Sequence, residues 1–549
     1  MLKIIPLGGL GEIGLNMMLF EYEDSIFIID AGLMFPEDYM MGVDIVIPKM
    51  DYIDRNKSKI AAIVLTHGHE DHIGAIPYLL KKVNAPIFAT PFTLGLIRHK
   101  LSEHQLLTEA NLYEIDTTEE LKIGPFKLEF IRVSHSVIDG VGIAIYTPEG
   151  LIVHTGDFKI NHSFLNNKET DLNKFAELGE KGVLALLSDS TNVEKEGYTI
   201  SSQEIAEKLK GIIKKASGRV IVALFASNIS RIEAIVKIAE KHGKKIIFNG
   251  FSLETSVRIA KELEYINISE GAEITIGEID DYPHDQVIII TTGSQGEPMS
   301  SLARMSAGIH KYLKVKKGDT IILSSKFIPG NEKAITKIIN NLYRKGADVI
   351  YEKISEIHVS GHAFKEELKL MINLVKPKYF IPIHGEYRHL VLHSRLAKKM
   401  GIDSEYILLT ENGQVIEFDD NRGKFAEKIT TGRVLIDGKG IGDVGSSVLR
   451  ERRALSEDGL VIVIMALDEE TGIIIYGPAI FSKGFVFPME TGYLLEDAKC
   501  VVLEVVEEIN YGVKNRNQKL EEKLKSSLRQ YFAYTIKRRP AIYPFIIEV

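Results

Sequence analysis

The stretch Thr66–His72 reads THGHEDH, and it carries the most specific signal in this chain of 549 residues. A short apolar run, Ala61–Leu65, precedes it and predicts a β-strand. Helical patterning over Ile73–Lys82 follows it. The sequence therefore predicts a polar loop between a strand and a helix, and the chemistry of the chain is expected there.

The side chains of this loop form a set of metal donors. Because side chains alternate along an extended backbone, His67 and His69 are expected to point to the same side. Asp71 and His72 stand where the helix begins, so the turn of the chain directs them towards the same point. Three imidazoles and a carboxylate suit a borderline divalent cation such as zinc or manganese.

Metal-type side chains also follow other predicted strands. They are Asp30 after Ile26–Ile29, His135 after Leu128–Val133, Asp157 after Leu151–His154 and His384 after Phe380–Ile383. Each alone is weak evidence, since an aspartate before glycine is usually a turn residue. Together they predict that one edge of a sheet sandwich carries a dinuclear site, with Asp157 as the candidate bridging carboxylate.

Composition narrows the class of protein. Lys and Arg number 67 against 75 Asp and Glu, a net charge of −8, which excludes a globally basic nucleic-acid coat but not a local basic path. A single cysteine, Cys500, excludes a disulfide framework and suits a reducing cytosol. No apolar run approaches the ~18–20 residues of a membrane span, and no secretory signal is evident. We expect a cytoplasmic protein.

The pattern of apolar residues changes along the chain. The first ~200 residues are rich in strands, and from near Ile200 strands and helices alternate, which predicts a parallel sheet. The predicted strands are Arg219–Leu224, Lys245–Asn249, Gln286–Thr291 and Asp319–Leu323, and the predicted helices are Arg231–His242, Leu253–Leu263 and Glu332–Arg344. After Gly361 the style of the first region returns. A late helix, Lys519–Tyr534, carries an apolar stripe of Leu520, Leu524, Leu528 and Phe532.

These motifs resemble a known family. The order of Asp30, the H-x-H-x-D-H loop, His135 and Asp157 resembles the metallo-β-lactamase fold. Asp189 in LLSDSTN, His362 in HVSGHA and His384 in PIHGEYRHL resemble three motifs of its nucleic-acid-processing branch, the β-CASP group. GGLGEIG, FASN, TTGSQGEP, PGNE and the ending KRRP further resemble ribonuclease J, over essentially the whole chain.

The resemblance implies an α/β fold class: a metallo-β-lactamase αββα sandwich with an inserted β-CASP parallel α/β domain and a small C-terminal α/β domain. The implied domains are residues 1–198 and 363–439 for the two parts of the sandwich, 199–362 for the β-CASP domain, 440–456 for a linker and 457–549 for the C-terminal domain.

The resemblance also implies a role for each candidate site residue. His67, His69 and His135 would hold one metal, and Asp71, His72 and His384 the other, with Asp157 bridging. Asp30 would fix a ligand histidine from behind, and Asp189 would act likewise near the loop. Asp71, Asp189 and His362 would act at the reaction itself. His362 would either donate a hydrogen bond to a phosphate oxygen or protonate the leaving 3′-oxygen. A pocket for a 5′-monophosphate would comprise Ser227, Asn228, His358, Ser360, Gly361 and His362.

The implied function is that of a zinc-dependent ribonuclease in RNA maturation and decay, with 5′-to-3′ exonuclease and endonuclease activity. Two zinc ions per subunit, or manganese or magnesium, would hold a hydroxide that attacks the phosphodiester and leaves 5′-phosphate products. RNA is the expected partner, with a homodimer or homotetramer, possible RNA-decay partners and no membrane.

Three rival functions stay open. A DNA-processing nuclease of the same fold is the main alternative, and His384 at the third motif argues against it. A small-molecule hydrolase would not need the large α/β insertion, and a scaffold would not need complete ligand motifs. Gly9–Gly14 matches a dinucleotide-binding pattern, but strands rather than a helix follow it, so we expect a tight turn there.

Overall fold

The computed structural model describes residues 1–549 apart from 38, 161–168, 296, 298, 326–330, 352–359, 439, 443, 487–491 and 511–514. His358, one of the predicted phosphate-pocket residues, lies outside the described residues. The chain divides into two compact units, Met1–Met34 with Ile47–Arg433 and Phe35–Val46 with Val434–Val549. Among the described residues, no helix combines the length and apolar character needed to cross a membrane.

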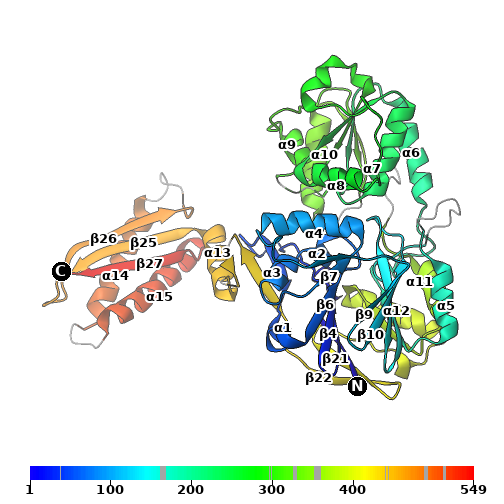
Figure 1. Ribbon diagram of the computed structural model, residues 1–549. Helices are drawn as coiled ribbons and strands as arrows, with labels where there is room; N and C mark the ends of the chain where they lie inside the picture. The colour runs from blue at the N-terminus through cyan, green and yellow to red at the C-terminus, as the bar shows by residue number, and fades with distance from the viewer. Residues whose placement is uncertain are drawn as a thin grey trace. The chain divides into compact units, whose positions relative to one another are not determined.

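The first unit contains an eight-stranded sheet. In sheet order its strands are β22 (Arg422–Lys428), β21 (Gln414–Asp419), β1 (Leu2–Gly8), β3 (Met17–Tyr22), β4 (Ser25–Ile29), β6 (Ile60–Val64), β7 (Ile87–Ala89) and β8 (Leu112–Glu114). Figure 1 shows the sheet in blue, apart from β21 and β22, which come late in the chain and are yellow. Its connecting helices are α1 (Asp51–Arg55), α2 (Glu70–Ile73), α3 (Ile76–Leu80) and α4 (Pro91–Glu103).

A six-stranded sheet packs against the first. In order its strands are β19 (Tyr379–Ile383), β13 (Ala185–Asp189), β12 (Gly150–His154), β11 (Val141–Thr147), β10 (Phe126–Arg132) and β9 (Glu120–Ile123). One apolar core joins the two sheets, with Phe20 and Phe27 from the first and Ile143 and Ile152 from the second. The outer face is covered by α5 (Leu172–Lys181), α11 (Lys365–Val375) and α12 (Tyr387–Lys399). The expected αββα sandwich is confirmed.

Strand direction explains where the polar residues gather. β4 and β6 are parallel neighbours in one sheet, and β12, β13 and β19 are parallel neighbours in the other. The carboxyl ends of parallel strands meet at one edge of a sheet. The loops after these strands therefore bring the candidate ligands to the same end of the sandwich.

The inserted segment forms a parallel sheet of its own, drawn in green in Figure 1. Its strands, in order, are β15 (Lys245–Asn249), β16 (Val287–Thr291), β14 (Val220–Ala223), β17 (Thr320–Leu323) and β18 (Asp348–Ile350). On one face lie α6 (Ser202–Lys215), α7 (Ile229–Lys241) and α8 (Phe251–Glu262). On the other lie α9 (Ser301–Ala307) and α10 (Glu332–Arg344). The alternation seen in the sequence predicted this sheet correctly.

One predicted helix is wrong in extent. Instead of a single helix over Ile73–Lys82, the structure has α2 and α3, separated at Gly74. A Cβ at Gly74 would lie 2.4 Å from Leu33 Cδ2 and 2.5 Å from Glu70 O, so the chain is crowded there. Pro77, in the first turn of α3, has no N–H to continue the helix before it.

The second unit is a smaller α/β body. Its three-stranded sheet runs β26 (Ile474–Lys483), β25 (Leu460–Leu467) and β27 (Ala541–Glu548), and α14 (Gly492–Glu508) and α15 (Arg516–Ile536) pack on one face. The predicted stripe of Leu520, Leu524, Leu528 and Phe532 is fully buried in this core. Residues 440–456, predicted as a linker, contain most of helix α13 (Ser446–Asp458).

The remaining short strands, from both units, are β2 (Leu10–Gly11), β5 (Ile45–Pro48), β20 (Gly385–Glu386), β23 (Arg433–Asp437) and β24 (Gly440–Ile441).

Candidate metal centre

Three histidine nitrogens converge at the carboxyl ends of β6 and β10. His69 Nδ1 lies 3.0 Å from His67 Nε2 and 3.1 Å from His135 Nε2. Nitrogens bound tetrahedrally to one zinc ion at ~2.0–2.1 Å would be about 3.3 Å apart, so the three atoms fit a single cation. These histidines and Asp157 offer ligand atoms that all lie within 4.8 Å of one another.

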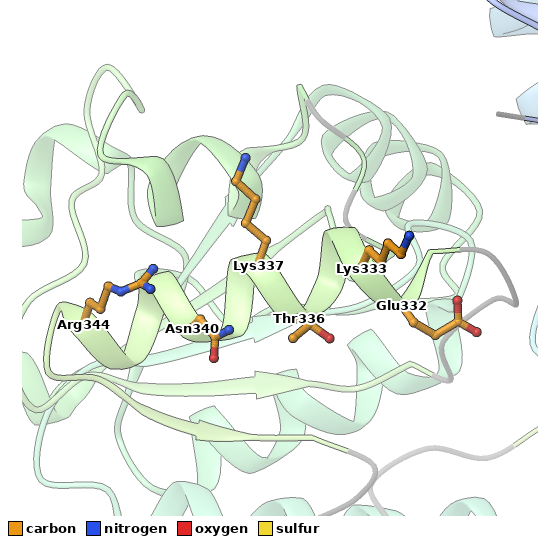
Figure 2. A pocket seen from close by; sticks show the side chains of 6 residues that line it. All are labelled: Glu332, Lys333, Thr336, Lys337, Asn340 and Arg344. Carbon is orange, nitrogen blue, oxygen red and sulfur yellow. The ribbon is translucent and has the colours of Figure 1, made fainter. Parts of the chain in front are cut away.

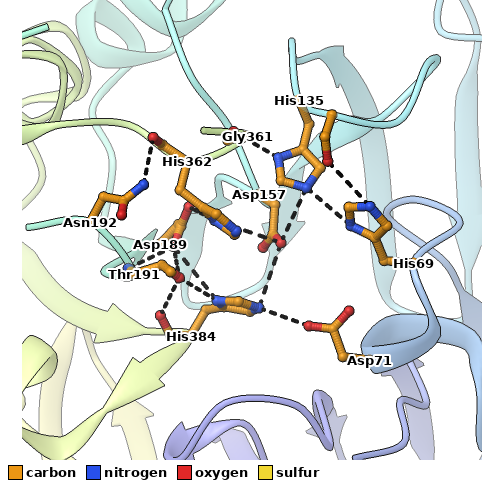
Figure 3. Close-up of polar contacts among 12 residues, drawn as sticks. His69, Asp71, His135, Asp157, Asp189, Thr191, Asn192, Gly361, His362 and His384 are labelled. Carbon is orange, nitrogen blue, oxygen red and sulfur yellow. Dashed lines mark hydrogen bonds and ion pairs between the residues drawn. The ribbon is translucent and has the colours of Figure 1, made fainter. Parts of the chain in front are cut away.

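Contacts behind the rings set which nitrogen faces the centre. His135 Nδ1 donates to Gly361 O at 2.7 Å, which leaves Nε2 free of its proton. Thr66 Oγ1 lies 3.1 Å from His67 Nδ1, and Ser136 Oγ lies 3.2 Å from His69 Nε2. Such contacts fix the tautomer and orientation of ligand histidines. Figure 3 shows the His135 and His69 part of this arrangement.

A second group lies beside the first. Asp71, His72 and His384 also offer ligand atoms within 4.8 Å of one another. His384 Nε2 is 3.3 Å from His72 Nε2 and 3.5 Å from Asp71 Oδ2. Asp71 and His72 lie in α2, directly after the loop, and His384 follows β19 with a positive φ of 53°. This backbone conformation is uncommon for a residue with a side chain.

Asp30, the residue that the family resemblance places behind a ligand histidine, contacts His72. Its Oδ2 accepts from His72 Nδ1 at 2.7 Å, so His72 Nε2 turns towards the centre. The same carboxylate accepts from the N and Oγ1 of Thr66, both at 2.8 Å. Asp30 is buried and has a φ of 61°, so the end of β4 is held in a fixed shape by these contacts.

Asp157 lies between the two groups. Its Oδ2 is 3.3 Å from His72 Nε2, 3.5 Å from His384 Nε2 and 3.7 Å from His67 Nε2. It is 3.8 Å from His135 Nε2. A single carboxylate oxygen therefore faces ligands of both groups, which is the arrangement that a bridging ligand requires.

Burial and charge divide the histidines into two kinds. Burial lowers the pKa of His67 and His135 well below the ordinary value, and lowers the pKa of His69 to about 4, so this group is neutral as a metal ligand must be. Burial also opposes charge on His384, but Asp157 and Asp71 outweigh it and raise the pKa of His384 to about 9. The second group thus lies in a field that attracts positive charge.

A third cluster joins Asp189 to His362. His362 Nδ1 lies 2.8 Å from Asp189 Oδ2 and 3.9 Å from Asp157 Oδ2. Asp189 Oδ1 accepts from the N and Oγ1 of Thr191 at 3.0 and 2.8 Å, and Thr191 Oγ1 lies 2.7 Å from His384 Nδ1. Asp157, Asp189, His362 and His384 together also satisfy the spacing of a metal site, although Asp189 and His362 were not predicted as ligands (Figure 3).

The predicted phosphate-pocket residues fall into two sets. Ser360, Gly361 and His362 adjoin the centre, where Asn192 Nδ2 donates to Ser360 Oγ and, at 3.0 Å, to His362 O. Ser227 and Asn228 follow β14 in the inserted sheet, and Asn228 Oδ1 accepts from Arg231 N at the start of α7. No hydrogen bond joins the two sets within the part of the chain that the structure describes.

Several polar residues of the site were missed from the sequence. Asn16 Nδ2 donates to Asp71 O at 3.0 Å and lies 3.2 Å from His72 Nε2. Thr191 and Asn192 stand in the LLSDSTN motif beside Asp189, so that motif was the available signal for them. Ser136 follows His135 directly, whereas nothing in the sequence around Asn16 marks it.

A hollow of about 430 Å³ lies elsewhere, along the outer face of α10 (Figure 2). It is lined by Glu332, Lys333, Thr336, Lys337, Asn340 and Arg344. None of these is a histidine or aspartate, and the helix is amphipathic with Ile335, Ile338, Ile339 and Leu342 buried on its other side. We therefore interpret this surface as the solvated face of the helix.

Family models match most of the chain. Residues 10–200 match the metallo-β-lactamase superfamily, and residues 217–342 match the ribonuclease J β-CASP domain. Residues 346–407 match a Zn-dependent metallo-hydrolase RNA specificity domain, and residues 447–549 match the ribonuclease J C-terminal domain.

Named relatives match over their full length. The chain is 43% identical to ribonuclease J 1 of Streptococcus pyogenes over 99% of this chain and 97% of that protein. It is 41% identical to ribonuclease J2 of Bacillus subtilis over 100% of this chain and 98% of that protein. A solved protein of unknown function from Enterococcus faecalis, 16% identical, shares the fold over 76% of this chain and 99% of its own with a TM-score of 0.55.

Proposed function

The chain belongs to the ribonuclease J family of metal-dependent ribonucleases, and we propose that it both trims RNA from the 5′ end and cuts it internally, in RNA maturation and decay. The observation that carries this proposal is the position of Asp157 Oδ2, which faces ligand atoms of two adjacent groups. Two cations sharing a carboxylate are the usual device for hydrolysing a phosphodiester.

The residues that would hold the metals follow from the two groups. His67, His69 and His135 would hold one ion, Asp71, His72 and His384 the other, and Asp157 both. The imidazole-rich donor set favours zinc. When bound, the two cations would supply a nucleophile at neutral pH and neutralise charge on the phosphoryl oxygens.

His362 is the proposed proton donor. Because Asp189 Oδ2 contacts its Nδ1 at 2.8 Å, the ring is held in one orientation with Nε2 on the opposite side. Burial opposes charge on this imidazole, but Asp189 and Asp157 outweigh it and raise the pKa of His362. A proton at Nε2 can therefore pass to the leaving 3′-oxygen, which leaves a 5′-phosphate on the downstream fragment.

A pocket for the 5′-monophosphate would use hydroxyl and amide groups. Asn228 uses its Oδ1 to cap α7, which leaves Nδ2 as a donor for a phosphate oxygen. Ser227 would act beside it, with Ser360 and Gly361 nearer the metals. His358, which lies outside the described residues, is proposed to complete the pocket. With a net charge of −8, RNA would be attracted by such local donors and by the metals. A cytoplasmic homodimer or homotetramer, with possible RNA-decay partners, completes the proposal.

The experiment uses matched RNA and DNA oligomers with a 5′-monophosphate and a 3′ label, incubated with the full chain with and without a chelator. We expect progressive shortening of the RNA alone, and its loss with the chelator. Cleavage of the DNA at an equal rate would contradict the proposed substrate. Internal cuts without trimming would contradict the exonuclease.

The identity of the metal needs a separate measurement. We expect elemental analysis of the purified protein to find about two zinc ions per chain. Activity restored to the chelated protein by zinc would agree with this, whereas restoration by manganese or magnesium alone would contradict the choice of zinc.

A further inference from the structure

The loop between β10 and β11 connects the metal centre to the inserted domain. It runs from Val133 to Gly140 and is closed at its base, where Val133 N donates to Gly140 O at 3.0 Å. Within it, His135 and Ser136 both contact His69 in the metal centre, at 3.1 and 3.2 Å. The position of this loop therefore determines where the candidate ligand His135 lies relative to His69.

The next two residues of the loop point into the inserted domain. Val137 is 2% exposed and belongs to the same apolar cluster as Ile229 of α7 and Ile259 of α8. Ile138 packs against that cluster, and Phe92 at the start of α4 is part of it. A single short loop thus carries the candidate ligand His135 at one end and packs in the core of the inserted domain at the other.

Asp139 secures the far end of the loop. Its Oδ2 accepts from Phe92 N at 2.8 Å and from the hydroxyl of Tyr265, just after α8, at 3.3 Å. Its Oδ1 accepts from Thr90 Oγ1 at 3.0 Å. One half-buried carboxylate therefore joins the ligand loop, the start of α4 and the inserted domain. Its φ of 53° is sparsely populated for residues with side chains, so these contacts hold an otherwise unfavourable backbone.

We propose that Asp139, acting with Tyr265, is a positioning residue that fixes the spacing between the metal centre and the part of the 5′-phosphate pocket that lies in the inserted domain, Ser227 and Asn228, and thereby favours exonuclease over endonuclease cleavage. The inference rests on the proposed function and adds a determinant of its specificity.

The physical reason is that trimming from the 5′ end needs two phosphates of the RNA to be bound at the same time, whereas internal cleavage needs only one. Trimming from the 5′ end requires the terminal phosphate in one domain and the scissile phosphate at the metals of the other. The distance between the two sites must then match the length of the nucleotide between them, and small errors in such positioning are costly. An internal cut requires the metal centre alone, so it does not depend on this spacing.

The test compares two RNAs on the same full-length preparations. A linear RNA with a 5′-monophosphate reports trimming, and a circular RNA of the same sequence has no 5′ end and reports internal cleavage. The variants are Asp139→Asn and Tyr265→Phe, the second of which keeps the ring that packs against the apolar cluster. Tyr343→Phe is the matched control, because it removes a hydroxyl that donates to Val349 O at 3.1 Å within the inserted domain.

We expect both variants to lower kcat/KM on the linear RNA relative to the circular RNA by about tenfold, and the control to leave the ratio unchanged. The double variant should lose no more than Asp139→Asn alone, because both changes break the same link. Parallel losses on both RNAs, or additive losses in the double variant, would overturn the proposal. A wild-type chain that cleaves neither RNA would instead overturn the proposed function, before any variant is made.

Discussion

The sandwich and the inserted domain both place polar side chains at the carboxyl ends of parallel strands, but the chemistry differs. In the sandwich, Asp157, Asp189 and His384 follow or end β12, β13 and β19. In the inserted sheet, the residues after the strands are hydroxyls and amides. They are Ser227 and Asn228 after β14, Ser294 and Gln295 after β16, and Ser324 and Ser325 after β17.

If both edges bind ligands as proposed, topology selects the place of binding and side-chain charge selects the kind of ligand. Ligands of open α/β sheets bind at the carboxyl ends of strands whatever their charge. Imidazoles and carboxylates at that edge suit cations. Neutral donors such as Gln295, whose Nε2 donates to Ser325 Oγ at 3.0 Å, suit an anion that must be released after each cycle.

The largest expected effect comes from removing a ligand at the metal edge. His69→Ala should lower kcat on RNA by at least about a thousandfold, because a cation that stabilises the transition state by several kcal/mol loses a ligand. Asp71→Ala should do the same. Steady-state cleavage with elemental analysis checks both, and His104→Ala is the control because His104 lies outside the three ligand groups. Wild-type turnover in either variant would contradict the ligand assignment.

A smaller effect should follow from a change behind the ligands. Thr191→Val keeps the shape of the side chain but removes the hydroxyl that contacts His384 Nδ1 at 2.7 Å and donates to Asp189 Oδ1 at 2.8 Å. Loss of a residue that orients a ligand typically costs about 10–100-fold in affinity or activity. We expect kcat and metal affinity to fall together. Thr191→Ser, which retains the hydroxyl, should restore most of the loss, and failure of this rescue would show that packing rather than hydrogen bonding matters there.

The candidate ligand residues could be picked out from the sequence because each follows a strand whose apolar run is visible. His67, His135, Asp157 and His384 required only local pattern and the rule that parallel strand ends meet. The helices and strands of the insertion followed from alternation in the same way. The supporting residues could not be found like this. Asn16 contacts Asp71 from 55 positions away, and no local pattern encodes that contact.

Other differences between the sequence-based predictions and the structure depend on contacts between segments that are distant in the chain, which a local sequence pattern does not contain. The helix predicted over Ile73–Lys82 is divided into α2 and α3, with Pro77 in the first turn of the second. Leu33, from another segment, lies so close to residue 74 that only glycine fits there. The link through Asp139 is of the same kind. Tyr265 lies 126 positions along the chain from Asp139 and contacts it only after two domains have packed.

A negative charge added beside Ser227 and Asn228, where the 5′-phosphate is proposed to bind, should weaken substrate binding, whereas negative charge at the metal centre favours binding of the cations. Asn228→Asp keeps an oxygen that can cap α7 but places a negative charge where the phosphate is proposed to bind. We expect KM for a 5′-monophosphorylated RNA to rise about tenfold, as repulsion between like charges near a protein surface predicts. The rise should be much smaller for the same RNA with a 5′-hydroxyl. Equal changes for both RNAs would show that Asn228 does not recognise the phosphate.

The last prediction concerns stability rather than activity, at the residue that joins the two regions. Burial raises the pKa of Asp139 to about 7, against hydrogen bonds from Phe92 and Thr90 that favour the charged form, with Glu114 adding a like charge. The folded chain therefore holds this proton more tightly than the unfolded chain, whose ordinary carboxyl has released it by about pH 4. As the pH rises from 4 to 7, the carboxyl must ionise in a buried place, and its contribution to stability falls. Asp139→Asn does not titrate at this position. Its free energy of unfolding should therefore gain on that of the wild type between pH 5 and 8, by no more than about 3 kcal/mol, and its thermal midpoint should rise relative to the wild type accordingly. Calorimetry of both proteins across this range measures the difference, and a constant difference would show that the Asp139 carboxyl keeps one protonation state while it joins the two domains.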